Sequence, residues 1–281
     1  MPRLTFIFTV AMLSAFGLIA SDIYLPAMPD MAMEFSIASS QMSQTISVYL
    51  LALAICQLFC GSLSDKFGRK PVIIAGIILY IAGSLGCAGA ANYRLFLTWR
   101  IVEALGAASG LVIGRALIAD SCDKPTSAKV YSLVYPLVSL SPALAPLIGG
   151  YLAVAFGWRA DFLFVALFGL LTLVMVIKLE ETRPRHAHAA ISPFSGFKQI
   201  LTNRIFWRYT LIVCCIYSAW FIYLTQSPFL FAQEGITEEG RGWLYLPLTA
   251  GIISANLLTK RLLNCWKYDH IVNTGIFCFV L

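Results

Sequence analysis

The sequence predicts an all-α integral membrane protein, and two observations support this prediction. Of the 281 residues, 59% are hydrophobic and only 12% are charged, whereas a soluble globular domain carries about 25% charged residues. The apolar residues also form long uninterrupted runs, and about 20 such residues cross the hydrocarbon core as one helix. The composition therefore excludes a soluble enzyme, a disordered regulator and a secreted disulfide scaffold.

Eight apolar stretches are long enough to be complete spanning helices, and a ninth begins near residue 271. Continuous apolar runs favour helices over a membrane β-barrel, whose strands alternate. The first run has a basic start like a signal peptide, but its length and the lack of an A-x-A site favour a spanning helix. The predicted helices lie near 4–25, 43–63, 71–91, 95–115, 130–152, 161–178, 207–227 and 242–259.

The positive charges predict the orientation of these helices, because cytoplasmic loops carry an excess of Lys and Arg. With successive loops on opposite sides, one side holds 16 of the 20 Lys and Arg residues and the other holds three, with Arg100 left inside a helix. We therefore expect the amino terminus to lie in the cytoplasm. The net charge of +6 reflects this excess of Lys and Arg in the loops on one side. Because only 12% of the residues are charged, the chain lacks the basic surface that binds nucleic acid, and we expect no nucleic-acid partner.

The longest polar segment, residues 179–206, separates the first six predicted helices from the rest. Six helices, a basic linker and further helices are typical of a transporter built from two parallel six-helix halves. We therefore expect an amino-terminal bundle over residues 1–178, a cytoplasmic linker over 179–206, and a partial second bundle over 207–281.

A basic loop between the second and third predicted helices carries the first motif. Its residues are Gly61-Ser-Leu-Ser-Asp65-Lys66-Phe-Gly68-Arg69-Lys70-Pro71. Gly68 permits a tight turn, and Pro71 suits the first turn of a helix. The three cations alone describe an ordinary cytoplasmic loop. The whole pattern, however, resembles the G-x-L-x-D-R/K-x-G-R-R/K signature of the major facilitator superfamily, and every defining position is present.

Two further motifs support a resemblance that covers the whole chain and implies the major facilitator fold. Arg100-Ile-Val-Glu103-Ala-Leu-Gly106 resembles the pattern R-x-x-Q-G-x-G, with Glu103 and Ala104 as departures. The fifth predicted helix resembles the G-x-x-x-G-P-x-x-G-G antiporter signature, which the superfamily associates with export. It departs at Ser141 and Ala145 and retains Pro142, Pro146, Gly149 and Gly150. The two prolines remove backbone donors, so we expect a hinge or a packing seam there, with ordinary helix plasticity as the alternative.

The end of the first predicted helix narrows the resemblance. Ser21-Asp22-Ile-Tyr24-Leu25-Pro26-Ala27-Met28-Pro29 is similar to the start of the bicyclomycin/chloramphenicol-resistance (Bcr/CflA) branch. That branch implies a multidrug efflux transporter of the bacterial inner membrane, which exports small amphipathic or cationic compounds in exchange for protons. It also implies a monomer in the lipid bilayer, driven by the proton gradient, with no cofactor, no metal and no enzymatic activity. The sequence lacks the G-x-S-x-G and H-E-x-x-H motifs of hydrolases.

Three ionisable residues lie at membrane depth, namely Asp22, Arg100 and Glu103. A charge near the bilayer centre costs about 2.5–3.5 kcal/mol, so such residues usually face the protein interior and act in function. Apolar surroundings and a nearby guanidinium act on a carboxyl in opposite directions, which would let Asp22 load and release a proton. The alternative is a solvated carboxylate at a helix end.

Arg100 and Glu103 stand at positions i and i+3 and can pair on one helix face. By resemblance, Arg100 transmits protonation to helix movement. Glu103 either carries a proton as well or only neutralises Arg100. Gly106, Gly110 and Gly114 form a small-residue ridge that allows a neighbouring helix to approach closely.

The resemblance also implies that Asp120 bonds the loop arginine, forming a gating cluster with Asp65 and Arg69. The alternative is a solvated surface ion pair worth about 0–1 kcal/mol. Aromatic residues are weaker candidates, because they either line a cavity for cargo or form interfacial belts. These aromatic candidates are Tyr24, Tyr49, Tyr131, Tyr135, Tyr217 and Trp220.

Two six-helix halves need twelve helices, whereas this sequence reaches only the start of the ninth. We therefore expect a truncated chain. The alternatives to drug export are an exporter of a specific metabolite on the same scaffold and a non-transporting remnant.

Overall fold

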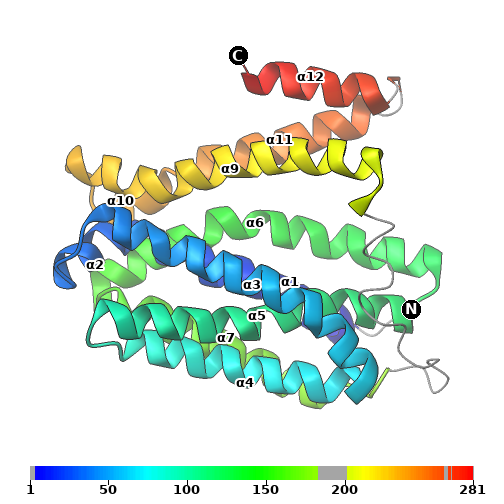
Figure 1. The fold of residues 1–281 in the computed structure, drawn as a ribbon, viewed down its shortest axis with the longest axis horizontal. Coiled ribbons are helices and arrows are strands. Elements are labelled where there is room, and N and C mark those ends of the chain that lie inside the picture. The colour runs from blue at the N-terminus through cyan, green and yellow to red at the C-terminus, as the bar shows by residue number, and fades with distance from the viewer. Residues whose placement is uncertain (1–3, 183–200, 263–264, 267, 281) are drawn as a thin grey trace.

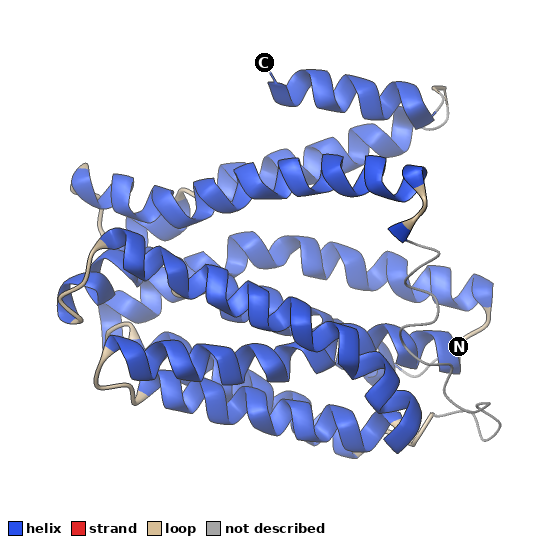
Figure 2. Ribbon diagram, viewed as in Figure 1, coloured by secondary structure: helices blue, strands red, loops and turns tan. Residues whose placement is uncertain are grey.

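Helices account for all the regular secondary structure among the described residues, and no strand occurs there (Figures 1 and 2). This computed structural model describes residues 4–182, 201–262, 265–266 and 268–280. Residues 183–200 of the predicted linker lie outside the described residues. The helices are α1 (Leu4–Asp22), η1 (Leu25–Ala27), α2 (Met28–Glu34), α3 (Ser39–Phe67), α4 (Arg69–Ala88), α5 (Tyr93–Ser121), α6 (Lys124–Phe156), α7 (Arg159–Ile177), α9 (Arg204–Gln233), α10 (Glu238–Trp243), α11 (Leu246–Leu262) and α12 (Tyr268–Val280).

Within the described ranges, seven helical segments are long and apolar enough to cross a membrane. They correspond to the first seven predicted helices. The eighth predicted helix is present as α11, but it has 17 residues and begins four residues later than predicted. Residues 242–243 belong instead to the short helix α10.

Several helices extend past the apolar runs because polar side chains cap their first turns. The side chain of Asn92 accepts a hydrogen bond from Leu95 N at 3.0 Å, so α5 begins at Tyr93. Asp123 accepts from Thr126 N at the start of α6. Such caps satisfy amide groups that have no partner within the helix, and a search for apolar runs does not detect them.

Two short helices, α2 and α10, were not predicted from the sequence. Prolines stand in the first turns of η1 and α2, where a missing amide donor costs nothing. These prolines divide the first spanning segment into α1, η1 and α2. Both short helices lie at the same end of the molecule, which we call the α10 end (Figure 1). The turn at Gly68 lies at the opposite end, which we call the loop end.

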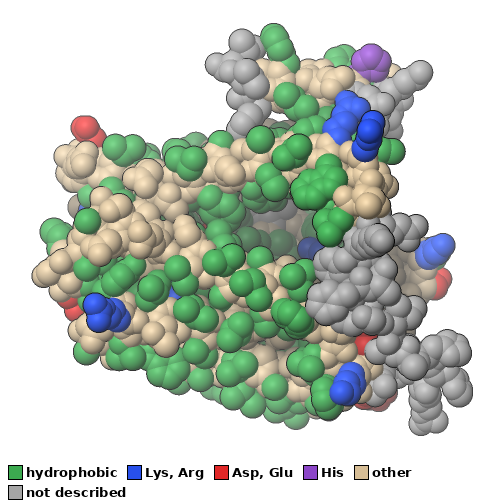
Figure 3. Space-filling model, in the orientation of Figure 1, with side chains coloured by type: hydrophobic (Ala, Val, Ile, Leu, Met, Phe, Trp, Pro, Cys, Tyr) green, Lys and Arg blue, Asp and Glu red, His purple; other side chains and the backbone are tan. Residues whose placement is uncertain are grey.

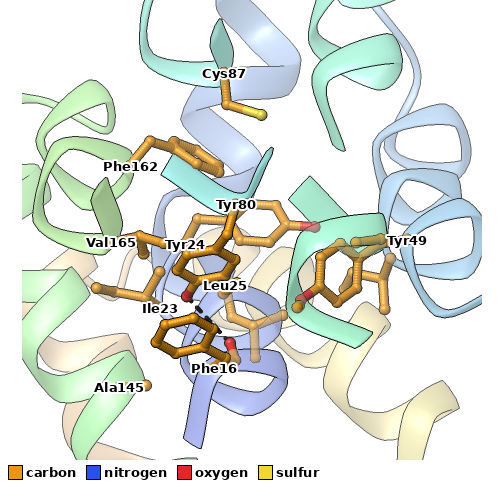
Figure 4. Close-up of a cluster of buried hydrophobic side chains, with 14 of the residues drawn as sticks. Phe16, Ile23, Tyr24, Leu25, Tyr49, Tyr80, Cys87, Ala145, Phe162 and Val165 are labelled. Atoms are coloured by element: carbon orange, nitrogen blue, oxygen red, sulfur yellow. Dashed lines mark hydrogen bonds between the residues drawn. The ribbon is translucent and has the colours of Figure 1, made fainter. Parts of the chain in front are cut away.

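The helices α1 to α7 pack side by side and form what we call the first bundle. Gly106 and Gly110 of α5 allow this packing, as the small-residue ridge predicted. A Cβ at Gly106 would overlap the backbone of Tyr80 on α4, and one at Gly110 would lie 2.7 Å from Leu13 O on α1. The buried core between these helices is rich in aromatic rings, and Phe16 stacks on Tyr80 with centroids 4.3 Å apart (Figure 4).

The segment from α9 to α12 lies along one side of the first bundle (Figure 1). At the α10 end, α10 contacts α6 and η1, and α9 contacts α2 and η1. Further along, α11 contacts α6 and α9 contacts α3. Figure 3 shows the molecule hollowed between α9 and the first bundle.

Candidate transport site

Asp22 is buried at the end of α1, where its side chain faces a cavity between the first bundle and the later helices. Only 4% of the residue is exposed, and Ser21 Oγ donates a hydrogen bond to Asp22 Oδ1 at 2.7 Å. A solvated carboxylate at a helix end does not match this burial. The cavity has a volume of about 380 Å³. Its lining residues are Leu18, Asp22, Val138, Pro142, Ile216, Tyr217, Trp220, Phe221, Leu224 and Ile252.

The cavity wall comes from α1, α6, α9 and α11, so both parts of the chain contribute to it. Asp22 is the one ionisable carboxyl in a lining that is otherwise apolar or aromatic. Tyr217 and Trp220, two of the aromatic candidates, lie on this wall. A site of this composition suits a flat apolar compound that carries one positive charge.

Arg100 is completely buried next to this cavity and is enclosed by aromatic rings. Its guanidinium carbon lies 4.2 Å from the ring centroid of Tyr49 and 4.7 Å from that of Tyr24. Arg100 Nη1 donates to Ala20 O on α1 at 3.0 Å. Nε and Nη2 have no hydrogen-bond partner among the described residues, so cation–π contacts stabilise that side of the guanidinium.

Glu103 forms the predicted ion pair with Arg100. The distance from Arg100 Nη1 to Glu103 Oε2 is 2.6 Å, and both side chains have zero exposure. Ser84 Oγ of α4 donates to Glu103 Oε1 at 2.8 Å. In this structure Glu103 therefore neutralises the buried arginine, while its role as a second proton carrier stays a prediction.

Arg100 connects this pair to Asp22. It holds the carbonyl of Ala20, two residues before Asp22, and its positive charge acts on the Asp22 carboxyl. Arg100 of α5 therefore binds the end of α1 that carries Asp22.

The other aromatic candidates lie elsewhere. Tyr24 and Tyr49 are fully buried around Arg100 and are not on the cavity wall; Figure 4 shows both rings within the core. The Tyr24 hydroxyl is 2.9 Å from Thr45 Oγ1. Tyr131 stacks on Tyr135 with centroids 5.4 Å apart, and Tyr135 lines a separate cavity between α6 and α11.

At the loop end, Arg69 joins the ends of three helices. Arg69 Nη1 lies 2.6 Å from Asp65 Oδ1 on α3, and Nε lies 2.9 Å from Asp120 Oδ2 on α5. Ser64 Oγ accepts a further hydrogen bond at 2.6 Å. The predicted cluster of Asp65, Arg69 and Asp120 is therefore formed, and the side chains of Arg69 and Asp120 are only 11% and 14% exposed.

Glu181 is a part of this cluster that the sequence analysis did not identify. Its carboxyl oxygens accept hydrogen bonds at 3.0 Å from the backbone amides of Arg69 and Lys70, at the start of α4. Lys70 Nζ also donates to Ile177 O at the end of α7. Gly68 has a φ of +103°, and a Cβ there would lie 2.8 Å from Glu181 Oε2. The start of α4 after this turn is therefore capped by Glu181, which lies 112 positions after Arg69 in the sequence.

The remaining loop-motif residues make simpler contacts. Lys66 Nζ lies 5.2 Å from the ring centroid of Phe67. Gly61 faces Val112 of α5, where a Cβ would meet the side chain at an ordinary 3.8 Å. The described hydrogen bonds of Arg69 are made instead with Ser64, Asp120 and Glu181.

The antiporter-like motif of α6 lies where three parts of the molecule meet. The helix runs without interruption through Pro142 and Pro146, so its role as a hinge stays a prediction. A Cβ at Gly149 would overlap Ile23 O, and one at Gly150 would lie 2.6 Å from Glu238 O of α10. These two glycines allow the end of α1 and α10 to approach α6.

A second group of charged residues at the α10 end was missed in the sequence. Arg241 is 7% exposed and binds Asp30 Oδ2 and Pro26 O at 2.8 Å each. Asp161 in the first turn of α7 is completely buried. Asp161 stands at the edge of the apolar run that predicts the sixth spanning helix, so a search for uncharged stretches treats it as the boundary of that helix. An acidic residue in a spanning segment is nevertheless a signal of a functional residue.

Spanning helices arranged around a cavity, with a buried charge network beside it, are typical of an integral membrane transporter. The family model of the Major Facilitator Superfamily matches residues 7–281, and the chain belongs to that superfamily. Its members are transporters rather than enzymes.

Relatives and solved structures agree with this assignment. The chain is 33% identical over 233 residues to the multidrug resistance protein MdtL of Salmonella typhi, which covers 82% of this chain and 59% of that protein. It is 32% identical to MdtL of Escherichia coli O139:H28 over 261 residues, covering 92% of this chain and 66% of the relative. The chain therefore spans about three fifths to two thirds of the length of these relatives.

Two solved structures show the same fold. A bacterial homolog of the human lysosomal transporter Spinster, in an inward-facing and unoccupied conformation, superposes with a TM-score of 0.79 at 17% identity, covering 95% of this chain and 65% of that one. A D-xylose–proton symporter superposes with a TM-score of 0.68 at 13% identity, covering 92% of this chain and 69% of that one.

Proposed function

We propose that the protein is a multidrug exporter of the Bcr/CflA branch, which moves small amphipathic or cationic compounds out across the bacterial inner membrane in exchange for protons. The observation that carries this proposal is the position of Asp22. It is a buried carboxyl on an otherwise apolar cavity wall, within reach of the charge of Arg100. The similarity to MdtL supports drugs as the cargo.

In the proposed mechanism, a proton and a cationic compound compete for Asp22. When Asp22 is ionised, its charge attracts the cation while Tyr217 and Trp220 pack against the flat apolar part. When Asp22 binds a proton, that attraction is lost and the compound is released. Arg100, held to α1 through Ala20, would pass the change of charge to helix packing.

The proposal includes the orientation and the organisation of the chain. The excess of Lys and Arg on one side supports an amino terminus in the cytoplasm, which would make the loop end cytoplasmic. We also propose two halves, with a first bundle over 1–178, a linker over 179–206 and a second bundle from 207. The transporter would act as a monomer and use the proton gradient without a cofactor or metal.

Drug-stimulated proton movement in inverted vesicles tests the mechanism. The chain is compared with a form extended to twelve helices, and the extended form is also made with Asp22→Asn. We expect proton movement in the extended form and its loss in the variant, because the amide cannot release a proton. Asp123→Asn is the matched control, since the new amide retains the cap on α6.

Unchanged proton movement in Asp22→Asn would remove Asp22 from the mechanism. Activity in the 281-residue chain would show that two complete halves are not required. Thermal stabilisation by metabolites, but not by lipophilic cations, would favour the metabolite exporter.

A further inference from the structure

Asp161 is a buried carboxyl group that the proposed transport mechanism does not use. It lies in the first turn of α7 with zero exposure. Neither Oδ1 nor Oδ2 has a hydrogen-bond partner among the described residues. A buried carboxylate without a hydrogen bond or a cation is strongly unfavourable, whereas the neutral acid avoids most of that cost.

The charged group that acts on Asp161 is another carboxylate, Glu238. Glu238 is the first residue of α10 and lies outside the spanning segments. Burial, followed by a hydrogen bond to Asp30 and the charge of Asp30, raises the pKa of Glu238 from 4.5 to about 7, and Arg241 opposes this shift. Two carboxyl groups near each other cannot both ionise cheaply.

Glu238 belongs to α10, so its charge acts on Asp161 only while α10 is docked on the first bundle. Gly150 of α6 lies against the backbone of Glu238, and Gly242 of α10 lies against Pro146 O, where a Cβ would stand 2.7 Å away. Arg241 Nη1 reaches across to Pro26 O and to Asp30. If α10 moved away, Glu238 and Arg241 would leave together.

The other titratable groups at this end are already paired or lie on neighbouring elements. Glu34 of α2 binds Arg159 at 2.7 Å and accepts a hydrogen bond from Trp158 Nε1. No cation in the described contacts reaches Asp161. Further titratable groups on the elements packed here are Tyr24 at the start of η1, Tyr151 on α6, Glu234 after α9, Glu239 on α10 and Tyr245, whose hydroxyl is 3.0 Å from Ser227 Oγ.

We propose that Asp161 is a proton-binding site that is completed when α10 docks on α6. On docking, Asp161 takes one proton from water and forms an O–H bond. On separation, the carboxyl is hydrated and returns that proton to water. A groove of about 560 Å³ lies at this end of the molecule, and its lining includes Asp30 and Arg241. The inference depends neither on the cargo nor on Asp22.

The site makes docking of α10 depend on pH. A carboxyl that is neutral in the docked form and ionised in the separated form favours docking at low pH. For Glu238 this preference weakens as the pH rises from 4.5 to about 7. Each proton bound on docking changes the equilibrium by up to about tenfold per pH unit within such a window.

Hydrogen–deuterium exchange of α10 in the purified chain tests the proposal without any transport measurement. Exchange is measured at one pH below and one above the pKa of Glu238, after correction for the intrinsic exchange rates. We expect α10 to lose protection at the higher pH. In Asp161→Asn, which cannot ionise, the loss should be several-fold smaller. Glu239→Gln removes a carboxylate from the same helix turn and should behave like the parent chain.

A purely structural role for Asp161 predicts a different result. Asp161→Asn would then change α10 protection by the same factor at both pH values, and this outcome would overturn the proposal. If Asp161→Asn fails to fold, the infrared carbonyl band of protonated carboxyl groups is compared between the parent chain and Asp161→Ser at the lower pH. We expect a loss in the variant, and an unchanged band would also overturn the proposal.

Discussion

The two ends of the molecule use charge in opposite ways. At the loop end, Arg69 binds two carboxylates and Ser64, and Glu181 accepts from two backbone amides, all around the starts and ends of α3, α4, α5 and α7. At the α10 end, Arg241 joins the first bundle to a segment 211 residues later. One network holds a bundle together, whereas the other holds two parts of the chain against each other.

This difference indicates which contacts would persist if α9 to α12 moved relative to the first bundle. The loop-end cluster does not involve α9 to α12 in any described contact, so it can remain intact while those helices move. The α10 end must lose the contacts of Arg241, and Glu238 must move away from Asp161, if the two parts separate there. The ionisable groups that docking itself controls are therefore at the α10 end, and the following changes test this comparison.

The largest expected effect is that of Gly68→Val at the loop end. The backbone φ of +103° costs a β-branched residue about 1–3 kcal/mol, and contact with Glu181 adds overpacking of similar size. We expect a marked loss of thermal stability, measured by unfolding in detergent. Gly61→Ala is the control, because its Cβ meets Val112 at an ordinary distance. Equal stability of the two variants would contradict the role of the turn.

A direct comparison of the two networks comes from Arg241→Gln and Arg69→Gln. Removing Arg241 leaves Asp30 without its cation, and because the Asp30 side chain is 36% exposed we expect a cost of about 1–3 kcal/mol, below the range for a fully buried pair. Hydrogen exchange should rise in α10 in the first variant and in the first turn of α4 in the second. If Arg69→Gln also released α10, the two ends would not be independent.

The smallest expected effect is that of Gly150→Ala. The new Cβ would lie 2.6 Å from Glu238 O, so we expect weaker docking of α10 by about 1–2 kcal/mol. Gly251→Ala on α11 is the matched control, because nothing lies within 4 Å of its Cβ. Exchange of α10 amides measures the difference, and equal protection in the two variants would show that the close approach is not needed.

Much of the fold was predictable because it depends on local properties of the chain. Apolar length predicts a spanning helix wherever it occurs, and Gly68 and Pro71 predict a turn followed by a helix start. The pair Arg100–Glu103 was predictable because residues at i and i+3 share a helix face. The short helices α2 and α10 were not predictable, since they lack both the length and the apolar run of a spanning segment.

The sequence was sufficient to name individual residues of the candidate site, but it did not show which of them lie together. The sequence was sufficient to make Asp22 a candidate residue, because a carboxyl group within an apolar run is energetically costly. Only the tertiary structure shows that Tyr24 and Tyr49 surround Arg100, whereas Tyr217 and Trp220 line the cavity. Sequence alone could not separate these two groups, because an aromatic side chain suits both a buried core and a cavity wall.

Residue type and spacing alone determined that this chain crosses a membrane as helices, turns at Gly68 and carries charges at depth. The tertiary structure decided which distant residues meet. Examples are Glu181 at the start of α4, Arg241 on Asp30, and Glu238 near Asp161. The physical reason is that hydropathy and helix geometry act over a few residues, whereas these contacts depend on how whole helices pack.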